Sequence, residues 1–424
     1  MLIPRFIINN PELVIDRLKV KNFEAKKLVE SFVTLDAKKR ELQNKLDSFK
    51  AEQNKTAKLI GSLFKEGKQE EANMLKNKSV ELKEKIKEFE SHFSPIEKEL
   101  KEKLLLIPNI PHPSVPAGKS EADNVELKKG GEIPKLKKQK LPHWELAKKY
   151  NIIDFELGNK ITGAGYPVYI GKGARLQRAL ISYFLDKARE EGFTEYMPPL
   201  MVNEDSAYAT GQLPDKDGQM YHMEKDNLFM IPTAEVPLTN IYRNVILKEK
   251  QMPVKLTGYT PCFRREAGSY GKDVRGLNRL HQFDKVEIVS IVEPEKSYDT
   301  LDEMVDYVEK LIKSLNLPYR IVKLCGGDLS FTSALTFDFE VFSAGQDKWL
   351  EVSSVSNFEA FQSSRLKLRY KAKGDKKTQL VHTLNGSALA LPRILAALLE
   401  NNQTEKGIKI PEILIPYTGF DLID

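Results

Sequence analysis

Residues 260–287, TPCFRREAGSYGKDVRGLNRLHQFDKVE, decide the fold of this 424-residue chain. An apolar segment leads into Arg264 and Glu266, a glycine-rich basic loop follows, and a second apolar segment returns to Glu287. This order predicts two strands joined by a loop. Arginine is the side chain suited to bidentate binding of phosphate or carboxylate. The hairpin therefore predicts an anion-binding site.

The loop of this hairpin carries Lys272 and Arg275. We expect the two cations to close over a polyphosphate or the end of an RNA. A basic hairpin without a ligand is the alternative, and the arginine and glutamate among apolar strand residues argue against it.

Residues 231–239, IPTAEVPLT, place Thr233 and Glu235 two positions apart. On an extended segment, residues two apart point to the same side. The pair is therefore suited to the ammonium or hydroxyl of a small polar ligand. Taken alone, the segment fits a surface turn better than a ligand site.

Residues 349–357, WLEVSSVSN, put Glu351 and Ser354 at the expected end of a strand. Carboxylate and hydroxyl oxygens are ligands for Mg²⁺. An edge strand with polar faces is the alternative.

Residues 383–400 contain one arginine, Arg393, in an otherwise apolar segment. A buried helix rarely keeps an arginine without a partner. A polyphosphate or a structural carboxylate would serve. His281 and His382 lack metal-ligand spacing with another His or Cys, and we expect both to be structural.

The remainder of the second half predicts strands in adjacent runs with helices between some of them. Expected helices are 175–191, 297–315 and 388–401; expected strands are 228–231, 285–292, 319–324, 336–342 and 349–352. This irregular order favours an α+β fold, an antiparallel sheet flanked by helices, over a doubly wound one. The glycine motifs of Rossmann and P-loop sites are absent from the sequence.

The first hundred residues have a heptad-like apolar pattern that breaks around Gly67. Two segments of about 35 residues predict a long antiparallel helical hairpin, with a kink at Pro95. A dimerisation coiled coil or a spacer is one interpretation; a probe for an elongated partner is the other. Lysines are frequent toward the tip: Lys45, Lys50, Lys55, Lys58, Lys65, Lys68, Lys76 and Lys78.

A Pro/Gly-rich stretch separates the two halves. We expect a helical arm at 1–110, a linker at 111–134 and a catalytic domain at 135–424. The net charge of +6 permits a nucleic-acid partner without demonstrating one. Two cysteines make a disulfide framework or cysteine-rich zinc site unexpected. We expect no signal peptide, no membrane helix and a cytoplasmic location.

Three of these segments together resemble the signatures of class II aminoacyl-tRNA synthetases: 192–200, 263–287 and 386–393. Within that class, the resemblance is to the seryl-tRNA synthetase family. It rests on IPTAEVPLT, the whole 260–287 stretch, EVSSVSN at 351–357, HTLNGS at 382–387, and on the arm and linker. It covers essentially the whole chain.

The resemblance implies a role for each site residue. Arg264, Arg393 and Glu287 would be catalytic, with Arg264 near the α-phosphate and the substrate carboxylate and Arg393 near the γ-phosphate. The implied ATP site comprises Arg264, Arg265, Glu266, Leu280, Phe283, Glu351, Val352, Ser353, Ser354 and Arg393. Glu266 and Phe283 would contact or stack on the adenine. The implied serine site comprises Thr233, Ala234, Glu235, Arg264, Glu287, Asn385 and Ser387.

The resemblance also implies the reaction and the partners. Serine would react with ATP to give seryl-adenylate and pyrophosphate and then pass to serine tRNA, or to selenocysteine tRNA where one exists. Glu351 and Ser354 would hold Mg²⁺, and zinc is not expected. The family implies a homodimer with a six-stranded antiparallel sheet. We expect no anticodon-binding domain after Arg393, so the arm would hold the tRNA through Lys45, Lys50, Lys55 and Lys76.

Four positions depart from the common family pattern: Ser364, Leu335, Phe337 and Pro95. Many members have Arg, Lys and Tyr at the first three positions. The sequence therefore does not decide whether this chain makes the family's tRNA or dimer contacts at these positions. A synthetase for threonine or proline, a carrier-protein ligase and a scaffold with a decayed site are the rival interpretations. The arm, the missing zinc ligands and the retained Arg264, Glu287 and Arg393 argue against them.

Overall fold

The computed structural model describes residues 1–136, 140–215, 218–267 and 275–424. These form two compact units. One comprises Leu2–Lys19 and Phe23–Pro108, and the other comprises Met1, Val20–Asn22 and Asn109–Asp424. Lys272, expected to close over a polyphosphate, lies outside the described residues.

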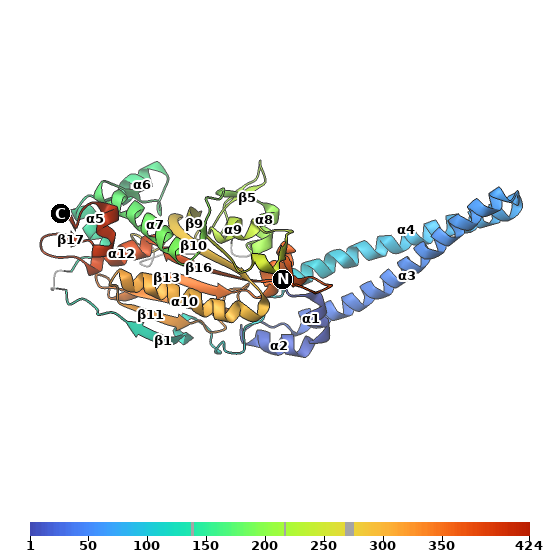
Figure 1. Ribbon diagram of the computed structural model, residues 1–424, viewed down its shortest axis with the longest axis horizontal. Helices are drawn as coiled ribbons and strands as arrows, with labels where there is room; N and C mark the ends of the chain where they lie inside the picture. Colours follow the sequence, from blue (N-terminus) through green and yellow to red (C-terminus); the bar gives the residue numbers. More distant parts are fainter. Residues whose placement is uncertain (137–139, 216–217, 268–274) are drawn as a thin grey trace. The chain divides into compact units, whose positions relative to one another are not determined.

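The smaller unit is a helical arm. Two short helices, α1 (Pro4–Asn9) and α2 (Pro11–Lys19), precede two long ones, α3 (Lys26–Lys65) and α4 (Gln69–Leu106). The long helices have 40 and 38 residues and pack side by side along their length (Figure 1). Gly67 lies in the turn between them with φ of +79°, a conformation that glycine adopts without steric cost. The predicted helical hairpin is confirmed.

The apolar heptad positions of the arm form the seam between α3 and α4. The seam includes the fully or almost fully buried Phe32 and Leu46 on α3 and Leu82 and Leu100 on α4. The rings of Phe49 and Phe89 meet edge to face, 5.3 Å apart. The helix α4 contains Pro95 and continues through it as one element. The buried Ile96 and Leu100 that follow hold this part of α4 against α3, although proline removes one backbone hydrogen bond.

The larger unit is built on an eight-stranded sheet with the order β1-β11-β12-β13-β16-β10-β9-β4. Six central strands are antiparallel, as predicted. Two short edge strands extend them: β1 is antiparallel to β11, and β4 is parallel to β9. The strands of the sheet are β1 (Val125–Gly130), β4 (Thr194–Glu195), β9 (Val254–Phe263), β10 (Gln282–Val292), β11 (Tyr319–Lys323), β12 (Leu335–Ser343), β13 (Lys348–Asn357) and β16 (His382–Ala390).

The edge strand β1 lies inside the segment 111–134 that was expected to be a linker. Glycines and prolines flank this strand, while its own sequence VELKKG pairs with β11 from Val125↔Lys323 to Gly130↔Tyr319. Part of the segment thus belongs to the sheet of the larger unit.

One face of the sheet is apolar and is covered by three helices, α7 (Lys172–Glu190), α10 (Ser297–Ser314) and α12 (Leu391–Asn401) (Figure 1). Their buried residues share one core with inward-facing strand residues such as Val286, Ile288 and Phe339. Because side chains alternate along a strand, Glu287 and Asp338 point to the opposite face. That face carries the site.

Smaller elements surround the sheet. The other helices are α5 (His143–Lys149), α6 (Phe155–Ile161), α8 (Glu204–Thr210), α9 (Glu235–Asn240), α11 (Ala360–Leu366) and α13 (Ile415–Thr418). The other strands are β2 (Ile153–Asp154), β3 (Val168–Tyr169), β5 (Met201–Asn203), β6 (His222–Met223), β7 (Leu228–Met230), β8 (Ile246–Lys248), β14 (Arg369–Lys371), β15 (Gln379–Leu380), β17 (Ile408–Lys409) and β18 (Leu422–Ile423).

The last helix begins later than predicted. Residues 388–390 complete strand β16, where Ala390 pairs with Lys285, and α12 starts at Leu391. Pro392 occupies the first turn of the helix, where its missing N–H costs nothing. The departures Leu335 and Phe337 are buried in the core of the larger unit. Among the described residues, no helix is long and apolar enough to cross a membrane.

Candidate active site

A cavity of about 760 Å³ opens on the polar face of the sheet. It collects side chains from β10, β13, β16, α9 and α12 and from the segments around residues 264–267 and 277–280. The predicted site residues in its lining are Thr233, Glu235, Arg264, Glu266, Leu280, Phe283, Glu287, Glu351, Val352, Ser353, Ser354, Asn385, Ser387 and Arg393. Thr233 and Arg393, which are 160 positions apart in the sequence, thus share one cavity.

Glu287 is the centre of a buried polar cluster. Thr233 Oγ1 donates to Glu287 Oε2 at 3.1 Å, and Asn385 Nδ2 donates to Glu287 Oε1 at 2.9 Å. Lys285 Nζ lies 2.5 Å from Oε2. A register shift in the pairing of β10 with β16 lies between Lys285 and Glu287. Four polar side chains are therefore held together at the inner end of the cavity.

Glu235 is also buried and shares this end of the cavity. It accepts a 2.5 Å hydrogen bond from Gln362 Nε2 on α11. Burial, and then the neighbouring carboxylate of Glu287, raise the pKa of Glu235 to about 7. Such a group is readily ionised by a cationic or hydrogen-bonding ligand.

The segment carrying Thr233 and Glu235 is not extended, which corrects the prediction. Glu235 is the first residue of α9, and its backbone N–H donates to Thr233 Oγ1 at 3.2 Å. A threonine hydroxyl satisfies one of the unpaired N–H groups at a helix start. Both side chains nevertheless reach the cavity.

Arg264 lies just beyond the end of β9, which stops at Phe263. Its Nε donates to the carbonyl of Pro232 at 3.3 Å, and its guanidinium lies 5.2 Å from the centre of the Phe283 ring. Glu266 has a φ of +47° and accepts from Arg279 at 3.1 Å. The expectation that Arg264 and Glu266 alternate on a strand is therefore wrong, because the strand ends before both.

Arg393 reaches the cavity from the first turn of α12. Its Nε donates to the carbonyl of Asn278 at 3.1 Å. Its Nη1 donates to the carbonyl of Glu351 at 2.7 Å and lies 3.3 Å from the Glu351 carboxylate. The arginine thus has a protein carboxylate as neighbour and still lines the cavity. Both partners considered from the sequence, a structural carboxylate and a polyphosphate, are therefore compatible with the structure.

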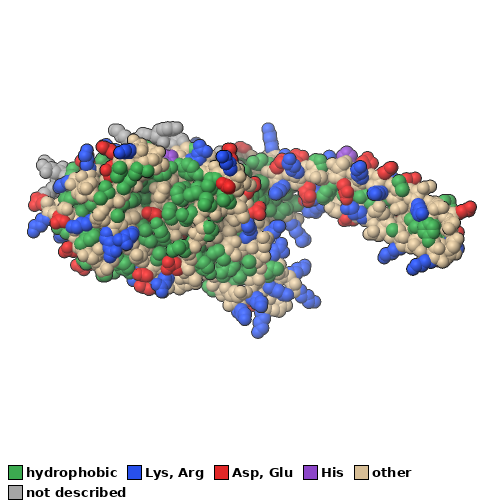
Figure 2. All heavy atoms as spheres, turned by 90° about the horizontal axis from the view of Figure 1, so that it is seen from above, with side chains coloured by type: hydrophobic (Ala, Val, Ile, Leu, Met, Phe, Trp, Pro, Cys, Tyr) green, Lys and Arg blue, Asp and Glu red, His purple; other side chains and the backbone are tan. Residues whose placement is uncertain are grey.

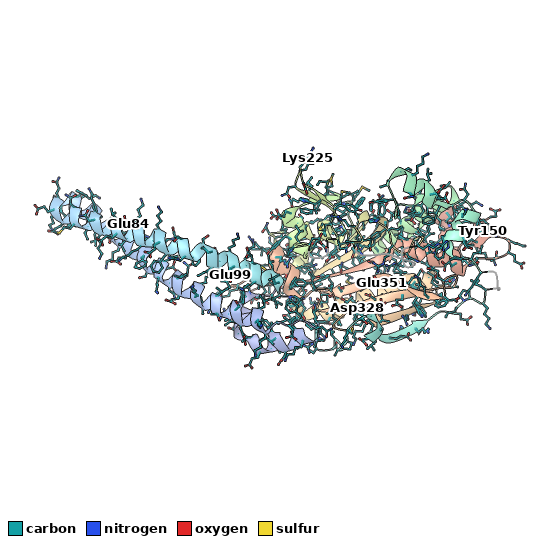
Figure 3. The ribbon with its side chains drawn as sticks, turned by 180° about the vertical axis from the view of Figure 1, so that it is seen from behind. Glu84, Glu99, Tyr150, Lys225, Asp328 and Glu351 are labelled. Carbon is teal, nitrogen blue, oxygen red and sulfur yellow. The ribbon has the colours of Figure 1, made fainter. Side chains whose placement is uncertain are left out.

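Glu351 and Ser354 lie in the middle of β13 and not at its end, as Figure 3 shows for Glu351 on the sheet. Across the strand pair, Asp338 of β12 faces Ser354. Burial, and then the charge of Glu351, raise the pKa of Asp338. Its Oδ1 is buried and has no hydrogen-bond partner within the part of the chain that the structure describes. Oxygen atoms of Asp338, Glu351 and Ser354 thus gather at a place where a second negative charge is unfavourable unless a cation binds.

Two predicted site residues lie outside the cavity lining. Arg265 is exposed, and its backbone N–H donates to Gln219. Ala234 is fully buried beneath the lining. The other sequence-predicted residues of the ATP and serine sets all line the cavity.

The two histidines singled out in the sequence have structural partners. His281 Nδ1 lies 3.1 Å from the carbonyl oxygen of Arg264 and 3.0 Å from the Tyr221 hydroxyl. His382 Nδ1 lies 2.8 Å from the Ser297 hydroxyl, and burial lowers the pKa of His382. Among the described residues, no group of three or more His, Cys, Asp or Glu side chains is arranged to hold a metal ion.

The arm lysines lie on exposed faces of α3 and α4, interleaved with acidic side chains (Figure 2). Lys45 pairs with Glu41 at 2.6 Å, and Lys50 pairs with Glu90 at 2.7 Å. Lys55 is exposed, and Lys76 lies 4.6 Å from the centre of the Phe64 ring. Such surface pairs contribute little to stability, so they leave the lysines accessible to a stronger anionic partner.

Three residues of the cavity region were missed in the sequence. Lys285 carries a readable signal, because it stands two positions before Glu287 on a predicted strand. Asp338 alternates with the apolar residues of β12, which is a similar signal. Gln362 has none, because its contact with Glu235 depends on how α11 packs in three dimensions.

Comparison with known proteins gives two family matches. Residues 1–111 match the seryl-tRNA synthetase N-terminal domain, and residues 220–402 match the class II core domain of tRNA synthetases for G, H, P, S and T. A serine–tRNA ligase of Salinibacter ruber is 51% identical over 413 residues, covering 97% of this chain and 96% of that protein. The chain belongs to the seryl-tRNA synthetase family.

Other members of the family agree in sequence and fold. The serine–tRNA ligase of Thermotoga neapolitana is 45% identical, with 99% of each chain covered. The crystal structure of seryl-tRNA synthetase from Pyrococcus horikoshii complexed with ATP has a TM-score of 0.92 at 36% identity, covering 100% of this chain and 99% of that one. The predicted membership of the seryl-tRNA synthetase family, and of its class II core, is confirmed.

Proposed function

We propose that the chain is a serine–tRNA ligase that works through the described cavity. The observation that supports this proposal is that two chemically distinct sets of side chains line one cavity. A buried cluster of carboxylate, hydroxyl and amide groups surrounds Glu287, and two arginines suited to phosphate, Arg264 and Arg393, lie in the same lining. Near-complete coverage by relatives named serine–tRNA ligase supports the same conclusion.

In the first half-reaction, an oxygen of the serine carboxylate attacks the α-phosphorus of ATP. The new O–P bond gives seryl-adenylate as pyrophosphate leaves. Negative charge accumulates on the phosphate oxygens, and Arg264, braced by Pro232 and Phe283, meets it as a preorganised cation. No dedicated general base is required, because the attacking carboxylate is already ionised.

In the second half-reaction, a ribose hydroxyl at the 3′ end of tRNA attacks the carbonyl carbon of the adenylate. The ester C–O bond forms as the bond between the carbonyl carbon and the phosphate oxygen breaks, AMP leaves, and the hydroxyl proton passes to the departing phosphate. The buried polar cluster around Glu287 holds the acyl group, and Glu235 and Thr233 bind its ammonium and hydroxyl groups. A selenocysteine tRNA as a second acceptor stays a prediction.

The residues fit a magnesium ion. Mg²⁺ prefers carboxylate and phosphate oxygens, and Glu351 and Ser354 would hold it beside the ATP phosphates. The buried Oδ1 of Asp338 has no partner among the described residues, and the repulsion between Asp338 and Glu351 raises the pKa of Asp338 further; both indicate that a cation would be favourable here. When bound, the ion would neutralise the developing charge on the phosphates.

We also propose that the chain forms a homodimer through the face around residues 196–202. Met197, Met201 and Ile241 are 92%, 48% and 42% exposed, and together they border a hollow of about 390 Å³. An exposed apolar patch of this kind is typical of an association surface. Sedimentation should give twice the 48.3 kDa chain mass, and Met197→Asp should yield the monomer. A monomeric wild-type chain at micromolar concentration would exclude the dimer.

The experiment that tests the proposed function is aminoacylation of tRNA with radiolabelled serine. We expect charging of serine tRNA and none of threonine tRNA. Arg264→Ala should lower adenylation by at least ~10²-fold, the effect of losing one preorganised donor. The matched control is Arg189→Ala, which removes an exposed arginine of α7 outside the cavity. Equal rates in the two folded variants would contradict the role of Arg264.

A further inference from the structure

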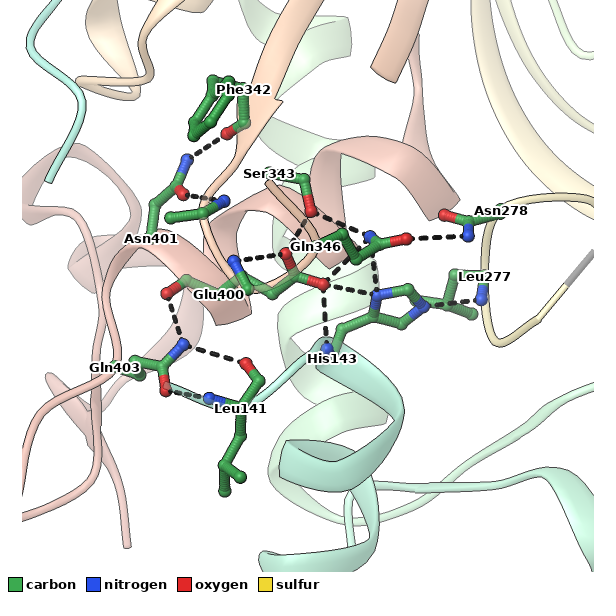
Figure 4. Close-up of polar contacts among 12 residues, drawn as sticks. Leu141, His143, Leu277, Asn278, Phe342, Ser343, Gln346, Glu400, Asn401 and Gln403 are labelled. Atoms are coloured by element: carbon green, nitrogen blue, oxygen red, sulfur yellow. Dashed lines mark hydrogen bonds and ion pairs between the residues drawn. The ribbon is translucent and has the colours of Figure 1, made fainter. Parts of the chain in front are cut away.

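A buried polar network lies beside the cavity, centred on His143 and Glu400 (Figure 4). His143 is the first residue of α5, Glu400 lies on α12, and both side chains are fully buried. Glu400 Oε1 accepts from His143 Nδ1 at 2.7 Å and from the His143 backbone N–H at 2.9 Å. Its Oε2 accepts from the Ser343 hydroxyl and from the Gly345 N–H. The family signatures contain neither His143 nor this contact.

The hydrogen bonds define the protonation state of the imidazole. The backbone N–H of Leu277 donates to His143 Nε2 at 2.8 Å, so Nε2 carries no proton. The proton is on Nδ1, which donates to Glu400. Burial alone would raise the pKa of Glu400, but the hydrogen bonds from His143 and Ser343 outweigh it and lower that pKa. The pair is therefore a neutral histidine and an ionised carboxylate.

The network ends on the wall of the cavity by two routes. In the first route, the Leu277 backbone N–H donates to His143 Nε2. The other runs through Gln346, whose Nε2 donates to Glu400 at 3.0 Å and whose Oε1 accepts from Asn278 Nδ2 at 2.9 Å. Leu277 and Asn278 both line the cavity. One carboxylate thus holds two consecutive residues of that wall.

The wall in turn positions Arg393, because the carbonyl of Asn278 accepts from Arg393 Nε at 3.1 Å. The approach of the wall to the imidazole is close. Gly276 has a φ of +68°, and a Cβ there would come within 2.2 Å of His143 Nε2. The neighbouring Arg275 lies 4.8 Å from the centre of the Trp144 ring. The chain is shaped to bring the 275–278 segment onto the start of α5.

We propose that His143, held by Glu400, is a positioning residue for the ATP side of the cavity. His143 accepts from Leu277, and Glu400 holds Asn278 through Gln346. These bonds fix the cavity wall and the orientation of the Arg393 guanidinium. This inference rests on the proposed function, in which Arg393 binds the polyphosphate of ATP. His143 touches no reacting atom, and its protons stay in place during the reaction.

Two substitutions at His143 separate its two bonds. In His143→Gln, the side-chain amide reaches the position of Nε2 and still accepts from Leu277. In His143→Asn, the shorter amide still donates to Glu400 and loses Leu277. We expect His143→Asn to raise the KM for ATP about tenfold, the effect of about one lost hydrogen bond. The KM for serine should change less than twofold, and His143→Gln should remain within about threefold of wild type for both substrates.

A purely structural role predicts a different pattern. Both variants would then lose thermal stability to the same extent, without a difference between the ATP and serine KM values, and that result would overturn the inference. A wild-type chain without serine-dependent exchange would instead overturn the proposed function, and direct calorimetric titration with ATP would still measure the His143 effect.

The tautomer gives a test that needs no variant. The chain has six histidines, so ¹⁵N-histidine labelling yields a small set of imidazole signals, and His143→Gln assigns one of them. We expect a neutral ring with its proton on Nδ1 at pH 7. An imidazolium, or a proton on Nε2, would overturn the inference, because Leu277 could not then donate.

Discussion

Lys285 Nζ lies 2.5 Å from Glu287 Oε2, and both side chains are almost completely buried, at 7% and 1% exposure. The two residues stand two positions apart on β10 and face the same cavity. Breaking a buried ion pair from one side leaves an uncompensated charge, which is costly. The pair therefore places a carboxylate and its partner cation side by side where the substrate is expected to bind.

Removing the cation alone should destabilise the protein. Lys285→Met should lower the free energy of unfolding by about 3 kcal/mol, because it strands the Glu287 charge. The double variant Lys285→Met/Glu287→Gln should recover most of the lost stability. Its KM for serine should not return to the wild-type value. Urea unfolding of the wild type, the single variant and the double variant measures this. Equal stability of the single and double variants would show that the pair is not coupled.

The raised pKa of Glu235, about 7, predicts pH-dependent use of serine. Ionised Glu235 binds an ammonium or accepts from a hydroxyl more strongly than its protonated form does. Serine binding should therefore release a proton, and kcat/KM for serine should rise with pH and level off above about 7. Glu235→Gln should flatten this profile while lowering kcat/KM. A wild-type profile that is flat from pH 6 to 8 would contradict the assignment.

Asp338 should support the binding of magnesium. Asp338→Asn removes a carboxyl group that a bound cation would favour in its ionised form beside Ser354 and Glu351, and the metal concentration for half-maximal activity should rise roughly tenfold, as for other residues behind metal ligands. Manganese binding measured by electron paramagnetic resonance gives the same quantity directly. Glu340→Gln, on the same strand and paired with Arg320, is the matched control. Identical metal dependence of the two variants would exclude the role of Asp338.

The arm should be required for only one half of the reaction. Deletion of residues 28–104 with a short Gly/Ser bridge removes most of α3 and α4 and none of the cavity lining. Pyrophosphate exchange should survive, and tRNA charging should be lost. If the intact chain binds tRNA through arm lysines, its affinity should fall with salt at a log–log slope of about −0.7 to −0.9 per phosphate neutralised. Full charging by the deletion variant would make the arm a spacer.

The sequence predicted the arm because a heptad pattern depends only on local spacing, as for Leu82 and Leu100. Five of the six central strands, β9 to β13, were predictable from short-range apolar patterns, whereas β16 (His382–Ala390) was not, and the six-stranded sheet was expected only from the resemblance to the family. The boundary of α12 was not predictable, because Ala388 and Ala390 suit a helix, whereas the pairing of Ala390 with Lys285 of β10 extends β16 to residue 390. Tertiary contacts decided that boundary.

The site was predicted where the chemistry is written in the chain. Arg393 is unusual among its apolar neighbours, Arg264 and Glu287 flank the basic loop of the 260–287 stretch, and all three line the cavity. The supporting residues were not predicted, because their roles depend on distant partners. His143 and Glu400 are 257 positions apart, and nothing local to either residue indicates the other.

The decisive measurement for a serine–tRNA ligase is serine-dependent exchange of pyrophosphate into ATP. Wild-type protein should catalyse it with serine and should reject alanine by roughly 10⁴-fold, because alanine leaves the buried polar groups around Glu287 unpaired. Threonine, excluded only by one methyl group, should be rejected less strongly. Exchange with alanine at the rate seen for serine, or exchange that does not depend on the amino acid, would contradict the account.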